Sequence, residues 1–459
     1  MGENAMDVKG KRALVCGMAR SGIAAAKLLA QLGAQVTISD VKEEAAFGGA
    51  LDELRALGCR FALAQGPQAL IPEQDMMIIS PGIPWERPFV QDAVAGGVQV
   101  MAELELGARL TRGALVAITG TNGKTTTTTL VGEIIRAAGR TAHVVGNIGY
   151  PITATAGISR EEDVTVAEVS SYQCEGISAF HPHVGAVLNI TEDHIARHGS
   201  MQTYIAMKRR IFANQTPEDV AVFNREDATC REMARGLCAR IAWFSTRERV
   251  GFGAYAEDGV IWLNAGAGTR AVCRCDEVRI PGAHNLQNAL AAVAITGVLG
   301  ISAETMRSVL MAFAGVEHRI ETVRELDGVT WINDSKGTNV DSTQKAIETM
   351  TRPTVLILGG SDKGVSFAPL AQVIAASPQI AHCVLIGDTA GQIGDALREA
   401  GYAAVSQAGH DFDRCIALCR ELAVPGGCVL LSPACASFDM FSDYEERGRV
   451  FKQKVTALR

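Results

Sequence analysis

The stretch that decides the fold is LVAITGTNGKTTTTTLVGEIIRAAG, which runs from Leu115 to Gly139. An apolar run ends at Thr119, a turn with two glycines follows, and a helical pattern of apolar residues then continues to Gly139. Strand, glycine-rich turn and helix in this order are typical of a phosphate-binding loop. The alternative is a turn that only reverses the chain, but Gly-Lys-Thr directly after a strand is hard to explain in that way.

The loop offers three kinds of group to a phosphate. Its glycines let backbone N–H groups face an anion without a Cβ in the way, and the helix that follows adds unpaired N–H groups at its start. A lysine can reach the outer phosphates, and a threonine hydroxyl can coordinate Mg²⁺. The strict pattern G-x-x-x-x-G-K-T fails by one residue, because Ile118 stands where the first glycine belongs. The candidate residues are Gly120, Thr121, Asn122, Gly123, Lys124, Thr125 and Thr126.

Length and composition limit the class of protein. A chain of 459 residues has room for about three domains, and 47% hydrophobic residues are enough for substantial cores. The net charge of −7 disfavours a non-specific nucleic-acid binder. We expect no signal peptide and no membrane span, and we interpret the twelve scattered cysteines as reduced thiols of a cytoplasmic protein.

The first hundred residues open in a Rossmann-like way. A strand over 11–16 runs into glycines at 17 and 22, and a second strand over 35–39 ends at Asp40. This pattern suits a nucleotide ribose or diphosphate, although Ala19 replaces the middle glycine of G-x-G-x-x-G. An NAD-dependent oxidoreductase is therefore the alternative from another class, and it would leave the loop at Lys124 unused. Further on, a buried strand over 76–80 runs into a turn at Gly82, which is either rigid structure or a ligand loop.

Two polar residues lie at the ends of expected central strands. Glu168 follows the apolar run 164–167, and a buried carboxylate is costly unless it is paired or binds a metal. Glu168 is therefore a candidate Mg²⁺ ligand. His194 lies at the carboxyl end of the strand 185–190, the edge at which open α/β sheets bind ligands. We interpret His181, His183 and His198 as surface or turn histidines.

Lys208 lies on the apolar face of a predicted helix over 201–214, beside Tyr204 and Ile211. One interpretation is a lysine at the edge of the apolar stripe that extends its charge to solvent. The other is a lysine in a cleft, where burial favours the neutral amine. A neutral amine can react with carbon dioxide to give a carbamate, which would be an anionic Mg²⁺ ligand. The spacing alone does not decide between the two.

A predicted helix over 286–299 begins near two asparagines. Asn285 can cap it, and Asn288 in its first turn could pair with an adenine edge, or both could be capping residues only. After a linker at 312–319, four strands over 330–333, 355–358, 383–386 and 428–431 each end in polar residues. Such ends collect at one edge of a parallel sheet, so the sequence predicts a binding face there.

Together these stretches resemble the Mur ligase family over nearly the whole chain. Residues 120–125 match its variant phosphate loop and 284–288 its adenine motif, while 80–83, 333–339 and 431–439 resemble the member that adds D-glutamate. The resemblance implies an α/β protein of three domains: a Rossmann-like UDP-substrate domain over 1–102, a central ATPase over 103–315 with a P-loop mononucleotide-binding parallel sheet, and a Rossmann-like amino-acid domain over 316–459.

The resemblance also implies an activity and its ligands. The reaction would be ATP-driven addition of D-glutamate to UDP-N-acetylmuramoyl-L-alanine through an acyl phosphate, in the synthesis of peptidoglycan precursors. The rivals are another amino-acid-adding ligase, including folylpolyglutamate synthase, and a scaffold that binds ATP but releases no phosphate. Two Mg²⁺ ions and a lysine carbamylated by carbon dioxide would assist, and we expect a monomer.

Roles carry over residue by residue. Lys124, Lys208 and His194 would be catalytic, and Thr125, Glu168, His194 and carbamylated Lys208 would organise Mg²⁺. ATP would meet the phosphate loop together with Asn285, Asn288, Arg319 and Asp334. The UDP substrate would meet Asp40, Gly82, Asn147, Ser171 and His194, and D-glutamate would meet Lys336, Thr338, Lys363, Ser437, Phe438 and Tyr444.

Overall fold

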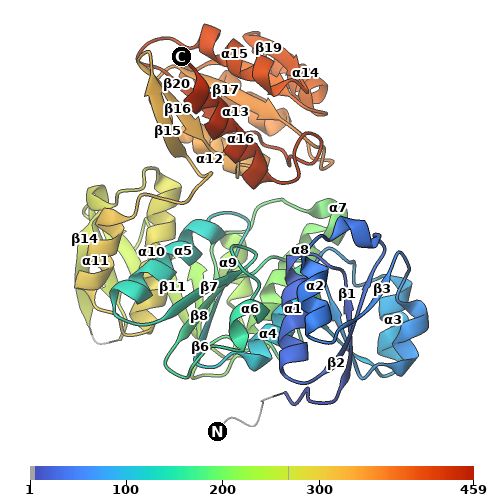
Figure 1. Ribbon diagram of the computed structural model, residues 1–459. Helices are drawn as coiled ribbons and strands as arrows, with labels where there is room; N and C mark the ends of the chain where they lie inside the picture. Colours follow the sequence, from blue (N-terminus) through green and yellow to red (C-terminus); the bar gives the residue numbers. More distant parts are fainter. Residues whose placement is uncertain (1–5, 267) are drawn as a thin grey trace. The chain divides into compact units, whose positions relative to one another are not determined.

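The computed structural model of the chain describes residues 6–266 and 268–459 (Figure 1). Two compact units are distinguished, and each is described by itself. The first comprises the chain up to 190 together with 200–278 and 287–312, and the second comprises 191–199, 279–286 and 313–459. The first unit holds two sheets and the second holds one. The division expected at 102/103 and 315/316 stays a prediction.

The first sheet has five parallel strands in the order β3-β2-β1-β4-β5. Buried side chains of α1 and α2 pack on one face, and those of α3 pack on the other. The elements are β1 (Arg12–Cys16), α1 (Arg20–Gln31), β2 (Gln35–Asp40), η1 (Glu44–Ala46), α2 (Ala50–Ala56), β3 (Arg60–Leu63), η2 (Gln68–Glu73), β4 (Met76–Ile79), α3 (Pro88–Ala95) and β5 (Gln99–Ala102). This confirms the Rossmann-like opening.

The second sheet has nine strands in the order β14-β13-β12-β11-β10-β9-β6-β8-β7. The strands are β6 (Ala114–Thr119), β7 (Ala142–Gly146), β8 (Val164–Glu168), β9 (Val184–Val187), β10 (Val220–Asn224), β11 (Arg240–Ser245), β12 (Gly253–Glu257), β13 (Val260–Asn264) and β14 (Thr269–Arg274). β6 lies between β8 and β9, so the phosphate loop follows an interior strand of the sheet.

The sheet is not parallel throughout, which corrects the expected central sheet. β13 runs antiparallel to both β12 and β14, and the strands from β7 to β12 are parallel. The helices of the first unit and its boundary segments are α4 (Glu103–Leu110), α5 (Lys124–Ala137), α6 (Thr153–Ala156), η3 (Gln173–Gly176), α8 (Met201–Arg209), η4 (Arg210–Phe212), α9 (Ala228–Met233), η5 (Cys275–Glu277), α10 (Ala283–Val298) and α11 (Ala303–Ala312).

The third sheet has the order β15-β16-β20-β17-β18-β19, and its five strands from β16 onward are parallel. α12, α13 and α14 pack on one face, and α15 and α16 on the other. The elements are β15 (Glu321–Leu326), β16 (Val329–Asn333), α12 (Val340–Glu348), β17 (Thr354–Gly359), α13 (Ala368–Ala375), β18 (Ile380–Ile386), α14 (Ala390–Glu399), β19 (Val405–Gly409), α15 (Phe412–Leu422), β20 (Cys428–Leu431) and α16 (Tyr444–Ala457). All four predicted strands are present and parallel, while binding of a ligand at their carboxyl ends stays a prediction.

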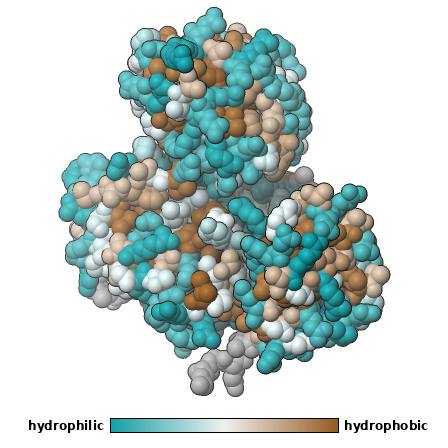
Figure 2. All heavy atoms as spheres, viewed as in Figure 1, coloured by the Kyte–Doolittle hydropathy of each residue, from teal (hydrophilic) through white to brown (hydrophobic). Residues whose placement is uncertain are grey.

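Polar side chains cover much of the visible surface, with apolar ones scattered among them (Figure 2). None of the described helices is long and apolar enough to cross a membrane.

Candidate active site

The phosphate loop leaves β6 and enters α5 through two glycines with left-handed or extended positive φ, Gly120 at +145° and Gly123 at +82°. A Cβ at Gly123 would collide with the Oδ1 atom of Asn288, so glycine is required there. The Lys124 ammonium folds back on its own loop and donates to the carbonyls of Gly120 (3.0 Å) and Thr121 (2.6 Å). The loop therefore presents a cation and a helix start at one place, which is an anion site.

Glu168 ends β8 beside this loop and is 1% exposed. Its Oε2 accepts from the Thr125 hydroxyl and its Oε1 from the Asn147 side-chain amide, both at 2.8 Å. A buried hydroxyl and a buried carboxylate in contact offer the hard oxygen atoms that Mg²⁺ prefers. The donor set thus fits the predicted metal, and the structure brings Thr125 and Glu168, two of the predicted ligands, into direct contact.

Lys208 is 2% exposed on α8, which excludes the alternative of a lysine that extends to solvent. Its Nζ donates to the Gly120 carbonyl (2.9 Å) and to the Thr119 hydroxyl (3.3 Å), and it lies 4.7 Å from the centroid of the Tyr204 ring. The lysine therefore reaches the first residue of the phosphate loop. Its carbamylation stays a prediction.

His194 belongs to the short segment 191–199, which is part of the second unit. It precedes α7 (Ile195–His198) with a left-handed backbone at φ +56°, and its Nε2 lies 3.4 Å from Asp193 Oδ2. Its role at the metal stays a prediction. The interpretation of His198 as a surface or turn histidine is wrong with respect to exposure, because that side chain is buried at 8%.

The two asparagines of α10 differ from the prediction in one respect. The helix begins at Ala283, so Asn285 lies inside its first turn instead of capping it, and its side-chain amide donates to the Pro281 carbonyl at 2.7 Å. Asn288 accordingly lies one turn further along, where its Oδ1 accepts from the Thr127 hydroxyl at 3.4 Å against Gly123. Asn288 therefore borders the phosphate loop.

In the second unit, Asp334 follows β16 and is 4% exposed. It accepts from the Ser432 hydroxyl (2.7 Å) and from the Ile320 amide (3.2 Å). Burial raises the pKa of this carboxyl to about 6, against the opposing effects of the Ser432 bond and the Arg319 charge. The neighbouring Arg319 has a buried Nε without a hydrogen-bond partner among the described residues, so it retains a donor for a ligand. Burial, with Arg319 and Lys345, lowers the pKa of His284 to about 4, so this histidine is neutral.

The residues predicted for D-glutamate lie on the loops that follow the parallel strands of the third sheet. Lys336 donates to the Tyr444 hydroxyl at 3.2 Å and lies 4.9 Å from the centre of its ring. Lys363 donates to the Thr338 carbonyl at 3.1 Å and lies 4.0 Å from Asp193 Oδ1. The two lysines thus lie on loops that contact each other, and their role in binding D-glutamate stays a prediction.

Ser437 and Phe438 follow β20, the first buried and the second 74% exposed. They adjoin a residue that sequence reasoning missed, Arg447 on α16, which is 1% exposed. Its guanidinium donates to the hydroxyl and carbonyl of Ser335 (3.0 and 2.8 Å) and to the carbonyls of Cys435 (3.1 Å) and Ala436 (3.2 Å). Arg447 therefore holds two loops of the predicted pocket. Its spacing of four from Phe451, and of eight from Val455, was the available signal, because all three share the buried face of α16.

In the first sheet, the Asp40 carboxylate at the end of β2 accepts hydrogen bonds from the backbone of two nearby turns. Its Oδ2 accepts from the Met18 amide (2.7 Å) and its Oδ1 from the Lys42 amide (2.9 Å). The opposite turn carries Gly82, beyond whose Cα there is open space. Ser171, predicted for the same substrate, is buried near the end of β8 in the first unit. Whether these residues contact a UDP group stays a prediction.

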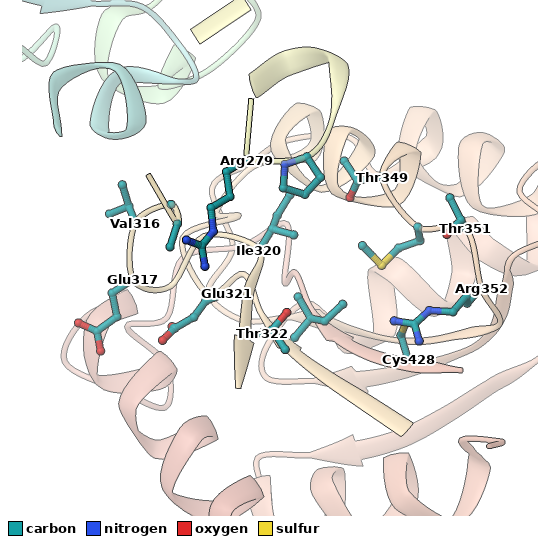
Figure 3. A pocket seen from close by; sticks show the side chains of 15 residues that line it. Arg279, Val316, Glu317, Ile320, Glu321, Thr322, Thr349, Thr351, Arg352 and Cys428 are labelled. Atoms are coloured by element: carbon teal, nitrogen blue, oxygen red, sulfur yellow. The ribbon is translucent and has the colours of Figure 1, made fainter. Parts of the chain in front are cut away.

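A separate cavity of about 730 Å³ lies in the second unit, and residues 314–317 form part of its lining (Figure 3). Its wall carries Arg279 and Arg352 together with Glu317 and Glu321, and both glutamates are paired with Lys452. None of the residues predicted for the active site lines it. This cavity is thus distinct from the predicted site.

Three family descriptions match this chain in order. They are the Mur ligase MurD-like N-terminal domain over 11–102, the Mur ligase middle domain over 118–296, and the Mur ligase glutamate ligase domain over 318–435. The chain belongs to the Mur ligase family.

Curated relatives specify the similarity further. The chain is 44% identical to the UDP-N-acetylmuramoylalanine--D-glutamate ligase of Pelotomaculum thermopropionicum, over 99% of each chain. It is 42% identical to the enzyme of that name from Clostridioides difficile, over 99% of this chain and 100% of the relative.

Solved structures share the fold at lower identity. UDP-N-acetylmuramate-alanine ligase MurC from Thermotoga maritima superposes with a TM-score of 0.61 at 18% identity, covering 97% of this chain and 99% of that one. A pseudomurein peptide ligase type C from Methanothermus fervidus gives the same score and identity over 97% and 100%. These two similarities concern the fold alone.

Proposed function

We propose that this chain joins D-glutamate to UDP-N-acetylmuramoyl-L-alanine, with ATP as the energy source, in the synthesis of peptidoglycan precursors. The observation that carries the proposal is the identity of 42–44% to D-glutamate ligases over 99% of the chain. Membership of this family disfavours the NAD-dependent oxidoreductase, and the relatives' names disfavour the folylpolyglutamate-type ligase. The reaction would take place in the cytoplasm, on a monomer.

The chemistry has two steps. A carboxylate oxygen of the alanyl group attacks the γ-phosphorus of ATP, and ADP leaves, which gives an acyl phosphate. The D-glutamate nitrogen then attacks the acyl carbon, the carbon–oxygen bond to phosphate breaks, and the nitrogen loses a proton. The first step replaces a poor leaving group, oxide, by phosphate, so the barrier left to the protein is mainly one of positioning and charge.

The first-unit residues would serve the phosphates. Lys124 and the amides of the loop would hold the β- and γ-phosphates, and Asn288 would meet the adenine. Mg²⁺, bound by Thr125, Glu168, His194 and carbamylated Lys208, would supply neutralisation of the charge that develops on the transferred group. The buried contact of Thr125 with Glu168 supports this assignment.

The remaining predicted residues would bind ATP from the second unit, D-glutamate, and the muramoyl and uridine diphosphate parts of the UDP substrate. Arg319 and Asp334 would hold ATP, and the free buried donor on Arg319 supports that role. Lys336, Lys363, Thr338 and Ser437 would bind the carboxylates of D-glutamate, with Phe438 and Tyr444 as walls. Asn147 and Ser171 would face the muramoyl part, and Asp40 and Gly82 would lie near uridine diphosphate.

Phosphate release from Mg-ATP tests the proposal. We would supply UDP-N-acetylmuramoyl-L-alanine and a panel of D- and L-amino acids, and expect release with D-glutamate only. Release with a different amino acid would keep the ligase mechanism and overturn the pocket assignment. No release with any of them would overturn the activity. Lys124→Ala should be inactive while Lys454→Ala, at a surface ion pair with Asp413, should match the wild type.

A further inference from the structure

Helix α4 begins with a carboxylate that is buried between elements. Glu103 follows β5 directly and is 1% exposed. Its Oε1 accepts two hydrogen bonds from one residue, Thr153: the backbone amide at 2.9 Å and the hydroxyl at 2.6 Å. Thr153 is the first residue of α6. Glu103, which directly follows the last strand of the first sheet in the chain, thus holds the first residue of α6, a helix that lies between β7 and β8 in the chain.

Two glycines keep α6 close to its neighbours. Gly107 lies one turn after Glu103 on the same face of α4, and a Cβ there would collide with Ile152 and lie 3.0 Å from the Thr153 nitrogen. Gly157, which follows α6, would with a Cβ lie 2.9 Å from Leu28 of α1. Helix α6 is therefore packed closely between α1 and α4. The hydrogen bonds from Thr153 to Glu103 are part of this close packing, which leaves no room for an added methyl group at either glycine.

The segment before α6 leads to the phosphate loop. Asn147 donates from its backbone to the Glu168 carbonyl (2.9 Å) and from its side chain to the Glu168 carboxylate (2.8 Å). At the other end, the Ala154 amide donates to the Pro151 carbonyl at 3.0 Å. The segment 147–152 is thus anchored at Glu168 on one side and through Thr153 at Glu103 on the other.

The environment of Glu103 favours its neutral form. Burial raises its pKa to about 7, opposed by the two Thr153 bonds. Charged residues on the elements packed against α4 are Arg20 and Lys27 on α1 and Glu175 on η3, and none of these contributes to the shift. On α4 itself, Glu105 is paired with Arg109. Both Thr153 donors meet one oxygen, which suits a neutral carboxyl whose carbonyl oxygen accepts while the other oxygen keeps the proton.

We propose that Glu103 is a positioning residue for the nucleotide-sugar substrate: by holding Thr153, it sets the place of the segment 147–152 and of Asn147 beside Glu168. The inference rests on the proposed function, in which Asn147 faces the muramoyl part. It adds a residue outside the pocket, and a protonation state, to the requirements of that site. Ionised Glu103 is expected to loosen the start of α6, because water must then enter to hydrate the carboxylate.

A substitution series separates positioning from folding. Glu103→Leu keeps the size but leaves two donors of Thr153 unsatisfied, so we expect KM for UDP-N-acetylmuramoyl-L-alanine to rise by about tenfold. The KM values for ATP and D-glutamate should change little. Glu103→Gln, which retains an accepting oxygen, should restore the wild-type value, and Glu133→Gln on the exposed face of α5 is the matched control. An equal rise in all three KM values, or no rise at all, would overturn the proposal.

A second measurement does not depend on activity. Amide hydrogen exchange over 147–156 would be compared between the wild type and Glu103→Gln at two pH values. About pH 6 lies below the Glu103 pKa of about 7, and about pH 8.5 lies above it. Relative to Glu103→Gln, the wild type should lose protection severalfold at the higher pH only. The same loss in both proteins would contradict the proposal. If no phosphate is released by any protein, the proposed function fails, while the exchange result still decides the role of Glu103.

Discussion

At the scale of the residue, Lys208 is the side chain whose environment most constrains the chemistry. Its amine is buried and donates to the first residue of the phosphate loop. Under the carbamate hypothesis, the ammonium loses one proton, and the neutral amine nitrogen then bonds to carbon dioxide and loses a second proton. A cation beside the loop thereby becomes an anion that a metal can bind. A buried cation at the same place would instead repel Mg²⁺.

We therefore expect Lys208→Ala to reduce turnover by at least about 100-fold, the upper end of the loss when support of a metal ligand is removed. Added short carboxylates should restore part of the activity, because they can occupy the space and supply the oxygen ligands. Removal of bicarbonate from the wild-type protein should also lower its activity, as the Lys208→Ala substitution does. If neither the substitution nor the depletion has an effect in steady-state assays, Lys208 is not a carbamate.

Asp334 gives a prediction about pH and stability. Its pKa is raised from the ordinary 3.8 to about 6 by burial, so the folded state favours the protonated acid. Its contribution to stability is full below about pH 4 and is lost as the pH rises through 6; the difference corresponds to about 3 kcal/mol. Asp334→Asn should therefore be more stable than the wild type in urea unfolding at pH 8, and equal to it near pH 4.

The same variant should bind ATP less tightly if Asp334 holds the nucleotide, so stability and KM for ATP would rise together. If Asp334→Asn were less stable than the wild type at pH 8, the hydrogen bonds that Asp334 accepts from Ser432 and Ile320 would outweigh the cost of burying its ionised carboxylate.

At the scale of the element, α16 joins the loops that follow β16 and β20 through Arg447. Arg447→Met should lower the free energy of unfolding by about 2 to 4 kcal/mol, because several buried acceptors lose their donor. It should also raise KM for D-glutamate more than KM for ATP, and Arg447→Lys should recover only part of both, since an ammonium cannot reach four acceptors in two loops. Urea titration and steady-state kinetics measure the two effects. Unchanged stability would contradict the anchoring role.

The elements show what sequence patterns can predict. Buried parallel strands such as β6 and β17 are continuous apolar runs between glycine-rich turns, and these were predicted. β15 was not, because Glu321–Leu326 is a half-exposed edge strand of alternating polar residues that resembles a linker. The antiparallel pairing of β13 with β12 and β14 was not predicted; only a short strand at Cys273 and Cys275 was expected, and it corresponds to β14.

The candidate site divides in the same way. The phosphate loop and Glu168 could be found because local spacing or an unusual residue in an apolar strand marks them. The burial of Lys208 could not be decided, since it depends on what covers α8. Arg447 could not be found by motif, because its partners are backbone carbonyls and Ser335, which lies 112 positions earlier.

At the scale of the whole molecule, the division into two compact units has a thermodynamic consequence. Because each unit has its own apolar core, calorimetry of the ligand-free protein should show more than one unfolding transition. Mg-ATP at about 100 times its Kd should stabilise the unit that carries the phosphate loop by about 2.7 kcal/mol. Chelation of Mg²⁺ or the substitution Lys124→Ala should abolish the shift. A single transition would mean that the two units unfold together.

The anchoring of two loops by Arg447 also bears on synthesis of the chain. The ribosome makes Ser335 112 residues before the arginine that holds it. At about 5 to 20 residues per second, this loop is synthesised roughly 6 to 22 seconds before the anchor exists, whereas β20, the last strand of the sheet, ends at Leu431 and precedes Arg447 by only roughly 1 to 3 seconds. Only in the last part of that interval does the predicted amino-acid pocket have all its β-strands while it lacks the guanidinium that holds its two loops. A ribosome that stalls before residue 447 would therefore release a product with a nearly complete sheet and no working pocket, a natural substrate for proteolytic quality control.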